Sequence, residues 1–242
     1  MNLAIDIGNT FIKMALFAEG QIVERWQMKE FSPEAVSKIF TDNPLIDKAI
    51  VVDGRGEQQA LEEFIKKRVA SFVRCDGSVP VPIKNLYSTP ATLGYDRLAA
   101  AVGAHAIYPQ NPVLIVDFGT AITYDVVTAE GEFLGGNISP GAESRFRALH
   151  DHTATLPLLS LPSGVSLTGH DTTSAIENGV ALGILFETER YMEALRSEYS
   201  EIQTIFTGGD ANYFAKLLKN PIFATSELVF YGLNAILEYN AK

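Results

Sequence analysis

Two short segments of the chain place an aspartate, a glycine and a small polar residue in the same order. The first reads Ile5-Asp6-Ile7-Gly8-Asn9 and the second reads Val116-Asp117-Phe118-Gly119-Thr120. A glycine lets backbone N–H groups approach phosphate oxygens closely, and a carboxylate at a strand end can hold a cation. These residue types therefore indicate phosphate and metal chemistry at both segments.

Side chains around the first segment suit the same chemistry. Asn9 and Thr10 add hydrogen-bond donors, and Lys13 can reach a terminal phosphate as a point charge. Asp6 is placed to hold magnesium directly or through water. Taken alone, Asp6 and Asn9 could equally be residues that shape a tight turn. The second segment decides between these interpretations, because it repeats the pattern.

Apolar runs flank both segments, so each segment is predicted to be the turn of a β-hairpin. The expected strands are 3–6 and 12–17 around the first turn, and 113–117 and 122–127 around the second. The two aspartates are 117 − 6 = 111 residues apart, close to half of the 242-residue chain. An internal repeat of this period predicts two related domains, 1–110 and 111–242. A central cleft between two such turns would grip a phosphate chain, as phosphoryl transfer requires.

A third carboxylate, Asp96, lies in Gly94-Tyr95-Asp96-Arg97 at the start of a predicted alanine-rich helix, 96–107. It could be an N-cap residue. It could also be a general base that accepts the proton of an attacking hydroxyl, with Arg97 binding an anionic group. The residues alone leave both interpretations open.

Further elements are expected on both sides of this helix. Ser32-Pro33 is typical of a helix start, and Ser174 and Glu177 are spaced as a capping box in a long helix, 172–198. Gly208-Gly209-Asp210 follows a predicted strand and is either a place for an adenosine or a bare left-handed turn. The remaining predicted strands are 49–52, 71–74 and 202–207, and the remaining predicted helices are 57–68, 212–219 and 226–239.

The amino-acid composition argues against several classes of protein. The 29 acidic and 19 basic residues give a net charge of −10, which weighs against binding nucleic acid through its phosphates. Cys75 is the only cysteine, so neither an internal disulfide nor a cysteine metal cluster is expected. We expect no signal peptide and no membrane span, and hence a cytoplasmic protein. The chain lacks the Gly-x4-Gly-Lys-Ser/Thr loop of P-loop kinases.

Five motifs in order give the chain a specific resemblance, which spans nearly its whole length. They are Asp6-Ile7-Gly8-Asn9-Thr10, Gly94-Tyr95-Asp96-Arg97, Asp117-Phe118-Gly119-Thr120-Ala121, Gly135-Gly136-Asn137-Ile138-Ser139-Pro140-Gly141 and Thr153-Ala154-Thr155-Leu156-Pro157. Together they resemble the motifs of type III pantothenate kinases. That family implies an α/β fold of two duplicated ribonuclease H-like, actin-like ATPase domains. It also implies ATP-dependent phosphorylation of pantothenate to 4′-phosphopantothenate, the first step of coenzyme A biosynthesis.

The resemblance assigns roles residue by residue. Asp96 would be the catalytic base, and Asp117 would hold a monovalent cation, potassium or ammonium, besides magnesium. ATP would be bound by Asp6, Ile7, Gly8, Asn9, Thr10, Phe11, Ile12, Lys13 and Thr120. Pantothenate would be bound by Tyr87, Gly94, Tyr95, Asp96, Arg97 and Thr172, although Thr173 adjoins the last and either hydroxyl could cap the long helix. The family also implies a homodimer.

Other candidates rank lower. Arg145 and Arg147 could meet phosphate, but a solvated surface role is preferred. The four histidines lack metal-ligand spacing, and Trp26 and Phe230-Tyr231 are interpreted as core or subunit contact. Two alternative functions stay open: an actin-like kinase for another small alcohol such as a sugar, and a non-catalytic accessory factor in transcription.

Overall fold

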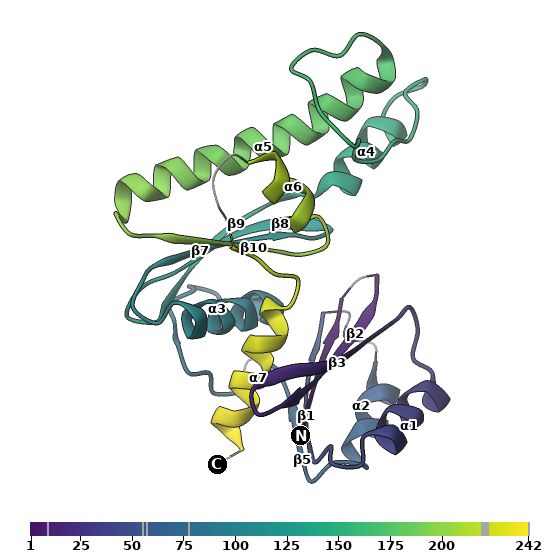
Figure 1. The fold of residues 1–242 in the computed structure, drawn as a ribbon, viewed down its shortest axis with the longest axis vertical. Helices are drawn as coiled ribbons and strands as arrows, with labels where there is room; N and C mark the ends of the chain where they lie inside the picture. The colour runs from purple at the N-terminus through teal and green to yellow at the C-terminus, as the bar shows by residue number, and fades with distance from the viewer. Residues whose placement is uncertain (9, 55, 57, 77, 219–222, 242) are drawn as a thin grey trace. The chain divides into compact units, whose positions relative to one another are not determined.

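The fold is described from a computed structural model of the chain (Figure 1). The description covers all residues except 9, 55, 57, 77, 219–222 and 242. Asn9, one of the predicted ATP contacts, lies outside the described residues.

The first sheet has five strands in the order β3-β2-β1-β4-β5. β1 pairs antiparallel with β2 and parallel with β4, so it is central and its residues 3–5 are buried. β2 also pairs antiparallel with β3, and β4 pairs parallel with β5. The bounds are β1 (Asn2–Ile7), β2 (Ile12–Ala18), β3 (Gln21–Met28), α1 (Pro33–Asp42), β4 (Lys48–Asp53), α2 (Gln59–Lys66) and β5 (Ser71–Arg74).

The second sheet has six strands in the order β11-β10-β7-β8-β9-β6. Apart from the two-residue β6, this order is that of the first sheet, with the first hairpin strand in the centre and parallel partners on one side. The predicted duplication is therefore confirmed in the topology. The bounds are β6 (Lys84–Asn85), β7 (Val113–Phe118), β8 (Ala121–Val127), β9 (Glu132–Pro140), β10 (Gln203–Thr207) and β11 (Phe223–Ala224).

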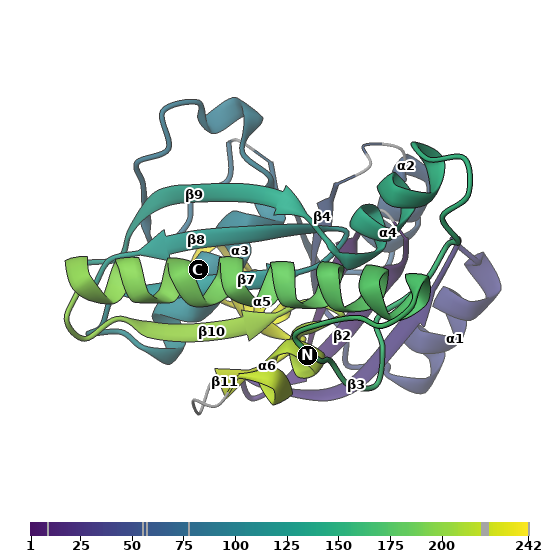
Figure 2. The same ribbon diagram turned by 90° about the horizontal axis from the view of Figure 1, so that it is seen from above.

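Helices follow the second hairpin as they follow the first. α4 (Ala142–Asp151) leads towards α5 (Thr172–Glu198), which runs along one face of the sheet (Figure 2), and α6 (Ala211–Leu217) lies between β10 and β11. The predicted bounds of α5 are confirmed, but its predicted capping box was wrong. Asp171 is the N-cap and its Oδ1 accepts a hydrogen bond of 2.8 Å from the Ser174 N–H. A carboxylate one residue before Thr172 therefore caps the helix, and neither threonine hydroxyl nor Glu177 is needed.

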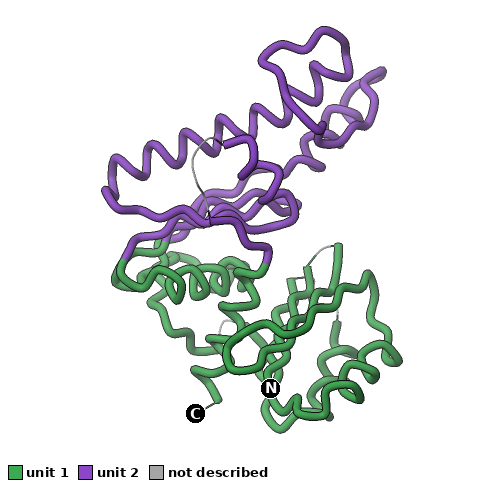
Figure 3. The backbone as a smooth tube through the Cα atoms, in the orientation of Figure 1, with its two compact units in different colours: residues 1–110, 127–134, 227–242 green, residues 111–126, 135–226 purple. Residues whose placement is uncertain are grey.

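The chain divides into two compact units, coloured in Figure 3. Unit 1 contains residues 1–110, 127–134 and 227–242, and unit 2 contains residues 111–126 and 135–226. The last helix thus packs with the N-terminal part of the chain. The domain boundaries and the cleft that the sequence suggested stay predictions.

Unit 1 is organised around the crossing of α3 (Tyr95–Ile107) and α7 (Leu228–Asn240). Their backbones touch at glycines. A Cβ added to Gly232 would lie 1.7 Å from the carbonyl oxygen of Ala99, and one added to Gly103 would lie 2.5 Å from the carbonyl oxygen of Leu228. Because backbone cannot move aside as a side chain can, any larger residue at these positions would force the two helices to shift.

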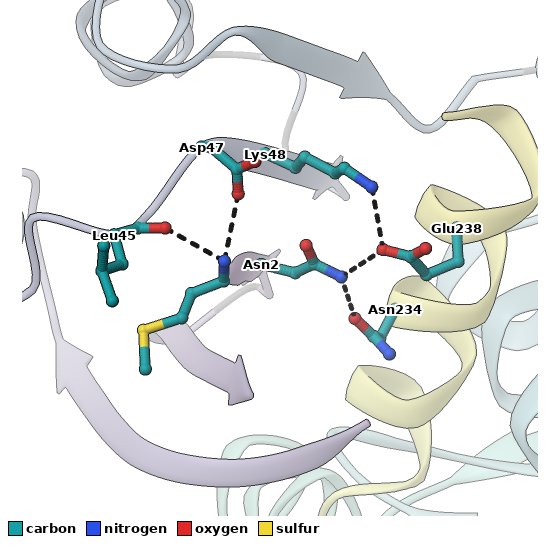
Figure 4. Close-up of polar contacts among 7 residues, drawn as sticks. Asn2, Leu45, Asp47, Lys48, Asn234 and Glu238 are labelled. Carbon is teal, nitrogen blue, oxygen red and sulfur yellow. Dashed lines mark hydrogen bonds and ion pairs between the residues drawn. The ribbon is translucent and has the colours of Figure 1, made fainter. Parts of the chain in front are cut away.

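Polar contacts hold α7 against the sheet of unit 1 (Figure 4). Asn2 of β1 donates to Asn234 Oδ1 at 2.8 Å and to Glu238 Oε1 at 2.7 Å, and Lys48 of β4 donates to Glu238 at 3.2 Å. These donors hold the pKa of the Glu238 carboxyl below its usual value, the Asn2 hydrogen bond contributing most. The helix is therefore tied to β1 and β4 as well as to α3.

Among the described residues, no helix combines the length and the apolar character that crossing a membrane requires.

Gly232→Ala is expected to destabilise the protein by about 1–3 kcal/mol, because the new methyl group overpacks the α3–α7 crossing. The matched control is Gly179→Ala in α5, where an added Cβ meets nothing within 4 Å and the gain in helix propensity should stabilise by about 0.5–1 kcal/mol. Urea unfolding at pH 7 measures both. Equal effects of the two substitutions would contradict the close crossing.

Candidate functional site

The first glycine turn joins β1 and β2 in unit 1. Asp6 and Lys13 are cross-strand partners near the turn, so their side chains lie on the same face of the hairpin. The N–H of Gly8 donates to the Phe11 carbonyl at 3.0 Å and closes the turn. Ile7 and Ile12 are fully buried in the core. If these two isoleucines contact a ligand, they do so through their backbone.

The carboxyl of Asp6 lies in an unusual electrostatic environment. Burial raises its pKa to about 6, the positive charge of Lys13 opposes the rise, and the negative charge of Asp96 adds to it. Asp96 lies in the first turn of α3, 90 residues further along the chain (96 − 6). Its charge nevertheless acts on Asp6 within one unit. Asp6 thus feels the charges of both the predicted base, Asp96, and its cross-strand partner, Lys13.

Asp96 is not the N-cap of α3, so that interpretation was wrong. The N-cap is Gly94, with extended backbone, and Asp96 stands in the first turn, where its Oδ1 accepts a 2.9 Å hydrogen bond from the N–H of Arg97. A Cβ on Gly94 would lie 2.5 Å from that same Oδ1. The residue is exposed, so its carboxylate is accessible to a hydroxyl substrate.

Arg97 follows Asp96 on α3, and its guanidinium faces Tyr87 within unit 1. Arg97 is only 8% exposed, and its guanidinium lies 5.5 Å from the centre of the Tyr87 ring, within the range of a cation–π contact. Tyr87 in turn packs on Phe133, with ring centres 6.4 Å apart. Tyr95 is half-buried, and burial raises its pKa. Four predicted substrate residues, Tyr87, Tyr95, Asp96 and Arg97, therefore belong to one unit.

The second glycine turn joins β7 and β8, and two other chain segments enclose it in unit 2. Gly208 has a φ of +89°, and a Cβ there would lie 2.4 Å from Asp117 Oδ1. A Cβ on Gly141 would lie 2.2 Å from the carbonyl oxygen of Gly119. Gly208 therefore has the left-handed conformation, which leaves room for the Asp117 carboxylate, and the adenosine site proposed for this segment stays a prediction.

Two polar residues near this turn were not assigned from the sequence. Burial, with the charge of Glu143, raises the pKa of Asp210, which follows β10. Ser144 donates to the Thr120 carbonyl at 2.9 Å. Glu143 and Ser144 directly follow the glycine-rich stretch 135–141, and this position is the sequence feature that could have marked them as candidates. Thr172, the remaining predicted substrate contact, is exposed at the first position of α5.

The residues can be tested for their fit to the implied cations. Among the described residues, no group of three or more histidine, cysteine, aspartate or glutamate side chains could hold a metal. Magnesium in phosphoryl-transfer sites needs only one or two carboxylates, because phosphates and water supply the other ligands. Asp6 fits that arrangement, since a cation would offset the cost of ionising a half-buried carboxyl. Asp117, an oxygen donor, suits a hard cation.

Solved structures of other proteins share this fold. The sheet order, repeated with a glycine turn at each central hairpin, defines an actin-like ATPase fold. ADP-bound MreB5 of Spiroplasma citri is similar over 98% of this chain and 96% of its own, with a TM-score of 0.52 and 10% identity. A conserved Campylobacter jejuni protein assigned to the Baf family of transcriptional activators is similar over 99% and 98%, with a TM-score of 0.65 and 20% identity. At these identities the two structures show the fold alone.

Sequence relatives are more specific. A family model described as type III pantothenate kinase matches residues 2–194. A type III pantothenate kinase of Phocaeicola vulgatus is 40% identical over 242 residues, which is all of both chains. The chain belongs to the type III pantothenate kinase family.

Asp6→Asn is expected to stabilise the protein at pH 7.5 by on the order of 1–3 kcal/mol. The folded-state pKa of Asp6, about 6, lies above the ordinary value of 3.8 for an aspartate. The wild type therefore loses stability as pH rises from about 4 to above 6, and the asparagine variant does not. Urea unfolding in EDTA at pH 4 and 7.5 should show a gain that shrinks at pH 4.

The control with the opposite sign is Asp76→Asn, because hydrogen bonds from Ser78 hold the pKa of Asp76 below its usual value. This substitution should lose stability at neutral pH. An Asp6→Asn gain that is equal at both pH values would contradict the burial of the Asp6 charge.

Proposed function

We propose that this chain transfers the γ-phosphate of ATP to the primary hydroxyl of pantothenate, giving 4′-phosphopantothenate and ADP in the first step of coenzyme A biosynthesis. Membership of the type III pantothenate kinase family supports this reaction. The observation that carries it is electrostatic: the charge of an exposed carboxylate, Asp96, and the charge of Lys13 both act on Asp6 of a glycine turn within one unit. A phosphate-binding turn and a proton acceptor are the two parts that transfer to an alcohol needs.

The proposed chemistry is an in-line displacement. Asp96 accepts the proton of the hydroxyl while its oxygen bonds to the γ-phosphorus, and the bond between that phosphorus and the leaving oxygen of ADP breaks. The hydrogen bond from the Arg97 N–H orients the Asp96 carboxylate. Bound magnesium supplies charge neutralisation on the phosphates.

We assign the remaining contacts as follows. The ATP contacts are residues 6–13 and Thr120, with Ile7 and Ile12 contributing backbone only. Arg97, nearly buried under Tyr87, supplies the positive charge that recognises the carboxylate of pantothenate. The other pantothenate contacts are Gly94, Tyr95 and Thr172.

The cations and the assembly are part of the same proposal. Asp6 holds magnesium and Asp117 holds a monovalent cation, potassium or ammonium. The protein is a cytoplasmic homodimer that binds neither nucleic acid nor membranes, in keeping with its net charge of −10. Light scattering of the purified chain measures the dimer directly.

Asp96→Asn should lower kcat by about 10²–10⁴, the usual contribution of a general base, while ATP affinity stays close to that of the wild type. The matched control is Asp42→Asn at the end of α1, an exposed carboxylate that pairs with Lys38 at 2.8 Å. It should leave kcat unchanged. Coupled ADP detection measures turnover, and a normal kcat for Asp96→Asn would remove the assignment.

An acceptor panel separates the alternatives. Phosphorylation of a sugar without phosphorylation of pantothenate would replace the proposed substrate. A folded wild type that binds DNA at physiological salt and turns over neither acceptor would favour the accessory factor in transcription.

Replacing potassium by sodium at constant ionic strength should lower the rate of the wild type several-fold. Asp117→Asn should run at the lower rate in both salts, because the carboxylate that holds the cation is gone. The measurement is ADP release in each salt. A potassium effect that survives in Asp117→Asn would contradict the assignment of the monovalent site.

A further inference from the structure

We propose that Arg145 is a positioning residue for the second glycine turn, residues 117–121, and that it acts through the backbone at the end of β9. The inference deepens the proposed function and rests on it, because it takes this turn as part of the ATP site. The side chain of Arg145 bonds to Pro140, Ser139 and Glu187, and in this proposal it does not contact the nucleotide.

The guanidinium of Arg145 is committed to contacts inside unit 2. Its Nε donates to the carbonyl of Pro140 at 2.8 Å, and its Nη2 donates to Ser139 Oγ at 2.9 Å and to Glu187 Oε2 at 2.6 Å. The Arg145 and Glu187 side chains are 21% and 27% exposed. The solvated surface role expected for Arg145 was therefore wrong. Its partners lie on two other elements, β9 and α5.

The segment that Arg145 holds is pressed against the turn. The N–H of Gly141 donates to the carbonyl of Thr120 at 3.0 Å, and Ser144 donates to the same carbonyl at 2.9 Å. A Cβ on Gly141 would lie 2.2 Å from the Gly119 carbonyl oxygen, so the two backbones have no room between them. A shift of Pro140 is therefore passed on to Gly119 and Thr120.

Glu187, the carboxylate partner of Arg145, lies on a part of α5 that contacts the sheet. Glu187 precedes Thr188, whose hydroxyl is hydrogen-bonded to Tyr124 of β8 at 3.1 Å, and Tyr124 stacks on Tyr191 with ring centres 4.2 Å apart. These contacts fix this part of α5 to the sheet. Only the planar fork of an arginine can reach a carboxylate, a carbonyl and a hydroxyl at once, which a lysine ammonium on a flexible stem cannot reproduce.

Arg147 provides a matched comparison on the same helix. It pairs with Glu143 at 2.8 Å, one turn back on α4, and both side chains are exposed, at 59% and 71%. Exposed pairs of this kind contribute little to stability. Loss of an arginine from α4 can thus be tested with and without loss of the contact to Pro140.

The experiment compares Arg145→Met, Arg147→Met and the double variant Arg145→Met/Glu187→Met. Equilibrium titration with ATP and magnesium, without pantothenate, gives the affinity, and thermal unfolding gives Tm. Arg145→Met should bind ATP about tenfold more weakly, the effect of losing roughly one charge-assisted hydrogen bond. Arg147→Met should bind as the wild type does.

The double variant separates positioning from stability. Replacing Glu187 as well removes the carboxylate that Arg145→Met leaves without its partner, so Tm should recover. ATP affinity should stay about tenfold reduced, because the Pro140 carbonyl still lacks the hydrogen bond from Arg145. In turnover, KM for ATP should rise while KM for pantothenate stays unchanged.

Wild-type affinity for ATP in Arg145→Met, or recovery of both Tm and affinity in the double variant, would overturn the inference. Because titration needs no acceptor, a wild type that binds ATP but fails to phosphorylate pantothenate would sink the proposed function and leave this test standing.

Discussion

The close approach of α7 to α3 is the constraint on which the site in unit 1 depends. α3 begins at the residues around Asp96, and α7 packs both on α3 and on β1, the strand that carries Asp6 near its end. The last helix of the chain therefore links the two carboxylates. Glycine at 103 and 232 permits the contact, and the polar tie of Asn2 to Glu238 fixes α7 on the sheet.

The glycine turns of the two duplicated halves have different surroundings. Each central hairpin presents an aspartate and a glycine near the end of its first strand, since both sheets follow one strand order. In unit 1 a lysine and a third carboxylate act on that aspartate, and its charge is costly to bury. In unit 2 backbone from two later segments encloses the turn, at Gly141 and Gly208. The first turn is thus distinguished by its charged side chains, whereas the second is held by close backbone packing and by hydrogen bonds to the Thr120 carbonyl.

Local patterns were sufficient for much of this fold. The repeated Asp-x-Gly segment predicted both hairpins, and the long helix predicted from about residue 172 to 198 agrees with the bounds of α5. The residues that cap the helices were predicted less well. Asp171 rather than Ser174 starts α5, and Gly94 rather than Asp96 starts α3, because several polar residues near a helix start compete and tertiary contacts choose among them.

Long-range pairings were not readable from the sequence. Arg145 and Arg147 look alike there, and what separates them is Glu187, 42 residues beyond Arg145. The glycines at the α3–α7 crossing are 129 positions apart (232 − 103) and give no local sign of contact. The raised pKa of Asp6 likewise depends on burial and on Asp96. The roles of the site residues stay predictions, which rest on the family and on this geometry.

The most direct test of the central claim is to identify the product. The purified chain is incubated with ATP, magnesium, potassium and pantothenate, and mass spectrometry and ADP detection are read from the same sample. The account predicts one 4′-phosphopantothenate for each ADP released. Release of ADP without that product, or no turnover by a folded protein, would contradict it.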